Sequence, residues 1–120
     1  MAHTILLVDD NRAIRKILRR MFEGAGYVCS ESENGKQAVT DAGRLRPDLI
    51  VLDYSMPTMN GLEAAPLLKK ILPQTPIIMF TMYANELFAQ EALAAGVTAV
   101  FSKDQAKTHL IPKAEALLSP

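Results

Sequence analysis

Short strand-like runs alternate along the chain with longer segments in which apolar residues recur every three or four positions. The short runs predict buried strands, and they lie at residues 5–8, 27–30, 49–52, 77–80 and 97–102. The segments between them have the spacing of amphipathic helices, which we expect at about 12–23, 36–45, 61–72, 85–95 and 108–118. This alternation predicts an α/β fold with a parallel sheet covered by helices on both faces, because parallel strands need crossover connections.

Two prolines fall within the helical pattern. Pro66 lies inside the third expected helix, where it removes a backbone donor and crowds the preceding turn, so that helix is expected to start late or to kink. The last helix is expected to begin near Thr108 or His109, which would place Pro112 in or next to its first turn, where backbone donors lack partners anyway.

The composition is that of a globular domain with balanced charge. The 120 residues, 49% of them apolar, fit a single domain over residues 1–120. Thirteen basic and thirteen acidic residues leave no net charge to attract nucleic acid or an anionic membrane. The single Cys29 cannot form an internal disulfide, and the first residues lack the features of a secretory leader. We therefore expect a cytoplasmic protein that contacts neither nucleic acid nor membrane directly.

Residues whose side chains can bind a metal ion or take part in catalysis follow four of the five predicted strands. They are the acids Asp9 and Asp10 after the first strand, Asp53 after the third, Thr81 after the fourth and Lys103 after the fifth. Ligands bind at the carboxyl ends of the strands in open parallel sheets, so these side chains are expected to meet. Clustered carboxylates suit a hard cation such as Mg²⁺. Together with a hydroxyl and an ammonium group they could support phosphoryl transfer with Asp53 as the nucleophile.

Each of these residues also has an ordinary structural interpretation. Asp10 or Asn11 could cap the first helix, Asp53 could be a turn acid, and Lys103 a solvated charge. Their placement at one edge favours a shared site over these separate roles. His3 and His109 have no ligand-like spacing and are expected at the surface.

With these motifs in order, the chain resembles the receiver domain of two-component response regulators over its whole length. The residues that carry the resemblance are Leu7 to Asp10, Asp53 to Gly61, Thr81, Gly96, and Ser102 with Lys103. It implies a flavodoxin-like, doubly wound (βα)5 fold with a five-stranded parallel sheet in the order 2-1-3-4-5.

The resemblance also implies a mechanism and partners. Asp53 would accept a phosphoryl group from a sensor histidine kinase, a phosphotransfer protein or a small phosphodonor. Asp10, Asp53 and the backbone carbonyl of Ser55 would hold Mg²⁺, or Mn²⁺ in its place, with Asp9 binding a metal water. Thr81 and Lys103 would contact the phosphoryl oxygens. The signal would be a change on the face formed by the helix at 85–95, the strand at 97–102 and the last helix.

The chain departs from the family pattern at two positions. Val100 stands where a mobile aromatic residue is usual, with Phe101 next to it. Asp104 follows Lys103 where a proline with a cis peptide bond is common, and a cis bond before a residue other than proline costs about 3 kcal/mol. Ser55 and Tyr83 occupy positions that tune the phosphoryl lifetime in similar proteins.

Three functions are compatible with these observations. The leading hypothesis is a stand-alone receiver without an output domain. It would catalyse only phosphotransfer to its own aspartate and hydrolysis from it, and it would signal to an unknown downstream protein, with a weak homodimer as an option. The alternative is an interaction module that does not depend on phosphorylation, as Val100 and Asp104 suggest. A metal-dependent phosphatase is disfavoured, because Ser55 replaces the second acid expected two residues after the nucleophile.

Overall fold

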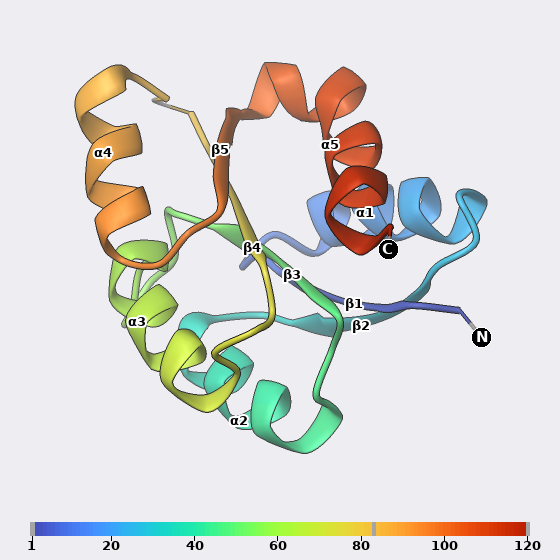
Figure 1. Cartoon of the computed structure of the whole chain (residues 1–120), viewed down its shortest axis with the longest axis horizontal. Helices are drawn as coiled ribbons and strands as arrows, with labels where there is room; N and C mark the ends of the chain where they lie inside the picture. Colours follow the sequence, from blue (N-terminus) through green and yellow to red (C-terminus); the bar gives the residue numbers. More distant parts are fainter. Residues whose placement is uncertain (1, 83, 120) are drawn as a thin grey trace.

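A computed structural model describes residues 2–82 and 84–119 of the chain, with the backbone alone described for Lys107. Five strands alternate with five helices in the described part (Figure 1). The strands are β1 Thr4–Val8, β2 Val28–Ser32, β3 Leu49–Asp53, β4 Ile77–Thr81 and β5 Ala99–Ser102. The helices are α1 Arg12–Gly24, α2 Gly35–Leu45, α3 Gly61–Ile71, α4 Glu86–Ala94 and α5 Lys103–Leu118.

All five strands run parallel in one sheet with the order β2-β1-β3-β4-β5. This confirms the predicted α/β class and strand order. In the register of the sheet, Val8 pairs with Leu52 and Thr81 pairs with Ser102. The residues that follow β1, β3 and β5 therefore reach the same edge of the sheet as the end of β4.

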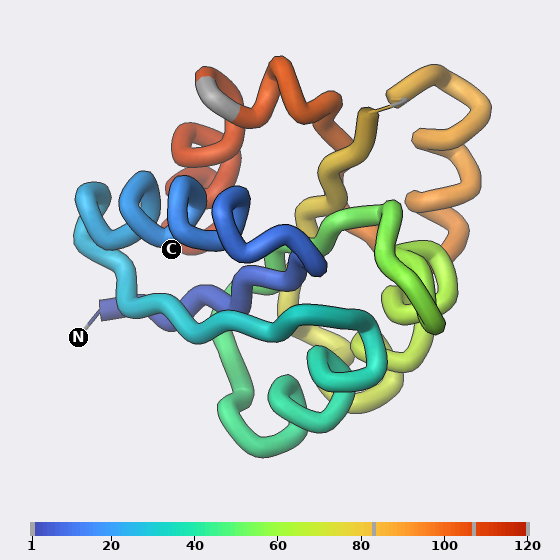
Figure 2. Tube along the Cα trace, turned by 180° about the vertical axis from the view of Figure 1, so that it is seen from behind, coloured from blue at the N-terminus to red at the C-terminus, as the bar shows by residue number. Residues whose placement is uncertain are grey.

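Alternate residues of the central strands face two separate cores. On β1, Leu6 and Val8 join a core that includes residues of α2, α3 and α4. Ile5 and Leu7 join the other core, with residues of α1 and α5. This two-residue period follows from the pleat of a strand. The helices accordingly cover the sheet in two layers, and Figure 2 shows α1 and α5 together on one side.

Each helix begins after an Asn or Ser whose side chain accepts a hydrogen bond from the backbone of the first turn. The caps are Asn11, Asn34, Asn60, Asn85 and Ser102. Of the two capping candidates before the first helix, the structure selects Asn11. Such side chains pair backbone donors that have no partner within the helix.

The predicted start of the last helix is wrong. The α5 helix begins at Lys103, directly after β5, because Ser102 and Gln105 form a reciprocal capping box. Pro112 consequently lies in the interior of α5 and not in its first turn. Of the two outcomes expected from Pro66, a late start of the third helix is not observed, since α3 begins at Gly61 behind a capping box and contains Pro66.

The largest differences in strand limits, of two residues each, are at the start of β5 and the end of β2. β5 starts only at Ala99, and β2 extends beyond its predicted end to Ser32, because Glu31 and Ser32 pair with the end of β1. No helix within residues 2–82 and 84–119 has the length and apolar character needed to span a membrane.

Candidate functional site

Three carboxylates meet at the carboxyl edge of the sheet. Asp9 follows β1, Asp10 comes next, and Asp53 ends the neighbouring strand β3; one oxygen of each lies within 4.8 Å of the others. Asp9 and Asp53 are 0% and 1% exposed, whereas Asp10 is open to solvent. The predicted convergence of these acids is therefore confirmed.

The two buried carboxylates are only partly satisfied by the described protein groups. The backbone N–H of Asn11 donates to Asp9 Oδ1 at 2.8 Å, and that of Ser55 donates to Asp53 Oδ1 at 3.4 Å. The second oxygens, Asp9 Oδ2 and Asp53 Oδ2, are buried without a hydrogen-bond partner among the described residues. A buried anionic oxygen without a partner is costly, so the site favours a positive charge between these groups.

Burial changes the acidity of both groups. Burial is the main reason why the pKa of Asp9 is raised to about 7. The hydrogen bond from the Asn11 N–H lowers this pKa, and the nearby charge of Asp53 raises it. Burial also raises the pKa of Asp53, and the ammonium group of Lys103 opposes that shift. Both carboxylates are therefore harder to ionise in the metal-free protein than ordinary surface acids.

The donor set fits Mg²⁺ or Mn²⁺. These cations prefer oxygen ligands and retain several waters, so a few carboxylates at an open edge are sufficient. Here two buried carboxylates, each with one oxygen that lacks a partner among the described residues, and one exposed carboxylate have oxygens within 4.8 Å of one another. Ser55 lies at the cluster through its N–H, and the role of its carbonyl as a ligand stays a prediction.

Lys103 places its ammonium group beside the acid cluster. Its Nζ is 3.6 Å from Asp53 Oδ1 and 5.5 Å from the centre of the Phe80 ring. The side chain is half-buried, because Lys103 opens α5 immediately after β5 and lies over the sheet edge. Asp53 thus has a cation within reach from a different element.

Thr81 ends β4 at the same edge. Its side chain is 1% exposed, and it lies one position beyond Phe80, which pairs with Asp53 in the sheet. The strand register therefore brings Asp9, Asp10, Asp53, Thr81 and Lys103 to one region, as the sequence predicts.

Gly61 allows the chain after Asp53 to return to the site. A Cβ atom at this position would lie 2.8 Å from the Asp53 carbonyl oxygen and 2.9 Å from Met79 Cε. The Gly61 N–H donates to the Tyr54 carbonyl at 2.8 Å. A side chain here would clash with the backbone of Asp53 and Tyr54, so the loop at 54–60 would have to shift.

The candidate switch residues Val100 and Phe101 pack against different cores. On β5, Val100 is half-buried and packs with the α4 residue Phe88 against one core, whereas Phe101 packs against the other core beside His109. Tyr83 lies outside the described residues. The described part of the chain contains no cis peptide bond, so the Lys103–Asp104 bond is trans.

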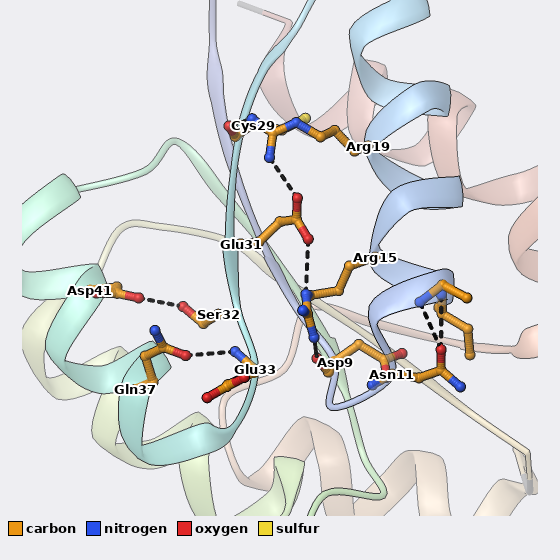
Figure 3. A network of polar contacts seen from close by, with 12 residues as sticks. Asp9, Asn11, Arg15, Arg19, Cys29, Glu31, Ser32, Glu33, Gln37 and Asp41 are labelled. Atoms are coloured by element: carbon orange, nitrogen blue, oxygen red, sulfur yellow. Dashed lines mark hydrogen bonds and ion pairs between the residues drawn. The ribbon is translucent and has the colours of Figure 1, made fainter.

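A polar network beside the acids was not predicted. Figure 3 shows Glu31 on β2 between Arg15 and Arg19 of α1, with Arg15 also bonded to the Asp9 backbone. In the sequence these arginines are only the polar face of an amphipathic helix. Their partners could be identified only after the position of α1 over β2 was known.

Comparison with known proteins agrees with this geometry. The model of the response regulator receiver domain family matches residues 5–115. The chain belongs to this family. Its members are the receiver domains of two-component phosphorelay signalling, and the fold and the ordered strand-end motifs described above are those of a receiver.

Some similar proteins are about as long as this chain, and others are about twice as long. The chain is 36% identical over 97 residues to the chemotaxis protein CheY of Thermotoga maritima, covering 80% of this chain and 81% of that protein. It is 36% identical over 117 residues to the phosphate regulon transcriptional regulatory protein PhoB of Pseudomonas aeruginosa, covering 96% of this chain but only 51% of that protein. The receiver thus spans about half the length of this second relative.

The three-dimensional similarity is close. A crystal structure of a Vibrio cholerae chemotaxis protein CheY superposes with a TM-score of 0.91 at 28% identity, covering 98% of this chain and 100% of that one.

Proposed function

We propose that this receiver accepts a phosphoryl group on Asp53 in a reaction that depends on Mg²⁺ or Mn²⁺. The observation that carries the proposal is the meeting of three acids from two strands with the Lys103 ammonium group, 3.6 Å from Asp53. A buried acid flanked by further acids and a cation is suited to hold a metal ion and a phosphoryl group side by side.

Each residue has a defined part in this reaction. An oxygen of Asp53 forms the new bond to phosphorus, while the bond from phosphorus to the donor's imidazole nitrogen or acyl oxygen breaks and its electron pair leaves with the donor. The bound cation would neutralise charge on the phosphoryl oxygens. Lys103 would offer a second positive charge, and the hydroxyl of Thr81, the last residue of β4, would donate to a phosphoryl oxygen.

Asp9 and Asp10 serve the cation. Asp10 is exposed and can bind it directly, and the buried Asp9 can accept hydrogen bonds from its waters. Water then completes the cycle by hydrolysing the acyl phosphate, so the only substrate acted on is Asp53 itself. We assign no reaction on an external substrate.

The partners follow from this chemistry. A histidine kinase or phosphotransfer protein in the cytoplasm would supply the phosphoryl group. A downstream protein, or a second receiver in a weak homodimer, would recognise the face of α4, β5 and α5, where Leu87 is 68% exposed and Phe101 is half-buried. Residues 1–120 would act as one signalling domain.

The second candidate is an interaction module that works without phosphorylation. Val100 in place of an aromatic residue and Asp104 after Lys103 favour it. The intact acid cluster and the Lys103 contact favour phosphorylation instead.

Intact-mass spectrometry after incubation with acetyl phosphate distinguishes these two functions. We expect the wild type to gain one phosphoryl group only when Mg²⁺ is present, and Asp53→Asn to gain none. Asp41→Asn is a matched control, because Asp41 is also buried but does not belong to the acid cluster, and its carboxylate accepts hydrogen bonds from the side chains of Ser32 and Arg44. No gain in a folded wild type that binds Mg²⁺ would favour the interaction module.

A further inference from the structure

Arg15 connects the acid cluster to the neighbouring edge strand. Its Nη1 donates to the backbone carbonyl of Asp9 at 2.7 Å, and its Nε donates to Glu31 Oε1 at 2.9 Å (Figure 3). The Arg15 side chain is 12% exposed, so both bonds lie largely away from solvent. One guanidinium group therefore joins β2, through Glu31, to the end of β1.

The bonded carbonyl belongs to the peptide unit between Asp9 and Asp10. A peptide unit is planar, so a bond to its carbonyl fixes the plane that leads into Asp10. Asp9 is already held at two other points, by its own N–H donating to Ser32 and by its side chain accepting from Asn11. Arg15 adds a third point, on the side of the residue that leads to the exposed Asp10.

Glu31 keeps the guanidinium in place. Its second oxygen accepts from Arg19 Nη1 at 2.6 Å, and Arg19 Nη2 also donates to the Cys29 carbonyl at 2.9 Å. Arg19 thus joins α1 to the same strand as Arg15 does, but without contact to Asp9. The two arginines share the function of attaching α1 to β2, but of the two Arg15 is the one that bonds to the acid cluster, whereas Arg19 bonds to Glu23 and Cys29.

From this difference we infer that Arg15 is a positioning residue for the cation site: it fixes the Asp9–Asp10 peptide so that both carboxylates face Asp53. The inference rests on the proposed function, because it assigns Arg15 to the proposed Mg²⁺ site. Groups that orient metal ligands commonly change metal affinity by about 10- to 100-fold when they are removed.

Calorimetric titration with Mg²⁺ tests the assignment with a matched pair of variants. We expect Arg15→Met to weaken Mg²⁺ binding by about 10-fold. Arg19→Met should stay within about twofold of the wild type. Arg15→Lys should lie between Arg15→Met and the wild type, because an ammonium group can donate to the Asp9 carbonyl without the fixed second bond to Glu31.

A measurement without metal accompanies the titration. In the metal-free protein, Arg15→Met should shift the backbone amide resonance of Asp10 more than Arg19→Met does, while circular dichroism shows that both variants are folded. Wild-type affinity in Arg15→Met, or an equal loss in Arg19→Met, would overturn the positioning role and leave the proposed function standing. If the wild type itself bound no Mg²⁺, the proposed function would fail, and an unshifted Asp10 resonance in Arg15→Met would overturn the role of Arg15 independently.

Discussion

Asp9 and Asp53 differ from ordinary surface acids because their side chains have almost no contact with solvent. Each has one oxygen that lacks a hydrogen-bond partner among the described residues. Such groups lower the free energy of unfolding when they are ionised, and a bound cation would offset this cost. At the scale of single residues, the ionised carboxylates therefore destabilise the metal-free fold.

The pH dependence of stability should report this destabilisation at Asp9. Its pKa in the folded protein is raised to about 7 from an ordinary value of 3.8. The stability associated with the neutral carboxyl is fully present below pH 3.8 and is lost as the pH rises through about 7. We expect Asp9→Asn to raise the free energy of unfolding of the metal-free protein at pH 8 by about 1–3 kcal/mol.

Urea unfolding at pH 4 and at pH 8, in the presence of a chelator, measures this effect. The gain from Asp9→Asn should shrink towards the lower pH, because at pH 4 Asp9 is neutral in the folded chain and only about half ionised in the unfolded chain. Equal effects at the two pH values would contradict the assignment of the raised pKa to Asp9.

At the scale of elements, local sequence signals determined most of the fold. The strands were predictable because Ile5 to Val8 and Leu49 to Leu52 are continuous apolar runs, as expected for strands buried on both faces. The start of α5 was not predicted, because a proline such as Pro112 is typical of a first turn, whereas the capping pair Ser102 and Gln105 starts this helix at Lys103. Tertiary packing of Ala106, Leu110 and Ala114 against the sheet keeps this proline inside the helix.

The interior proline gives a stability prediction for α5. Pro112 is exposed in the interior of α5. Within a helix, proline is about 3 kcal/mol less favourable than alanine. Part of this cost is offset because proline lowers the conformational entropy of the unfolded chain. We expect Pro112→Ala to raise the free energy of unfolding by about 2 kcal/mol in urea titrations. Glu115→Ala, an exposed change in the same helix, should have little effect. A destabilised Pro112→Ala would mean that the proline ring is required where it is.

At the scale of the whole molecule, one sheet separates two cores. Its central strands contribute to both, with Ile77 in the core of α2, α3 and α4, and Ile5 in the core of α1 and α5. Because both cores share this sheet, unfolding of one core should disrupt the other. The domain should therefore unfold in a single transition. The sequence also predicts which edge of the sheet carries the site, because the carboxyl ends of parallel strands lie at the same edge.

Contacts between elements that are distant in the chain could not be predicted from the sequence. The Arg15–Glu31–Arg19 network depends on how α1 lies over β2, and the 3.6 Å contact between Lys103 and Asp53 depends on how α5 leaves β5. The sequence predicts that Lys103 and Asp53 approach each other, but their distance, and the partners of Arg15 and Arg19, follow only from packing.

A pair of conservative substitutions tests the single-domain prediction. Ile5→Val and Ile77→Val each remove one buried methylene group, and each should lower the free energy of unfolding by about 0.5–1.5 kcal/mol. The double variant should show the sum within about 0.5 kcal/mol. Its unfolding curves by circular dichroism and by tyrosine fluorescence should coincide. Separate transitions for the two probes would contradict one cooperative domain.

The central claim, that Asp53 is the phosphoryl acceptor, is tested most directly by locating the modification. The protein is incubated with acetyl phosphate and Mg²⁺ and then reduced with borohydride, which converts an aspartyl phosphate to homoserine. Peptide mass spectrometry identifies the converted residue. Homoserine at position 53, absent without Mg²⁺, is the predicted result. Homoserine at position 9 or 10, or none in a folded protein that binds Mg²⁺, would contradict the assignment.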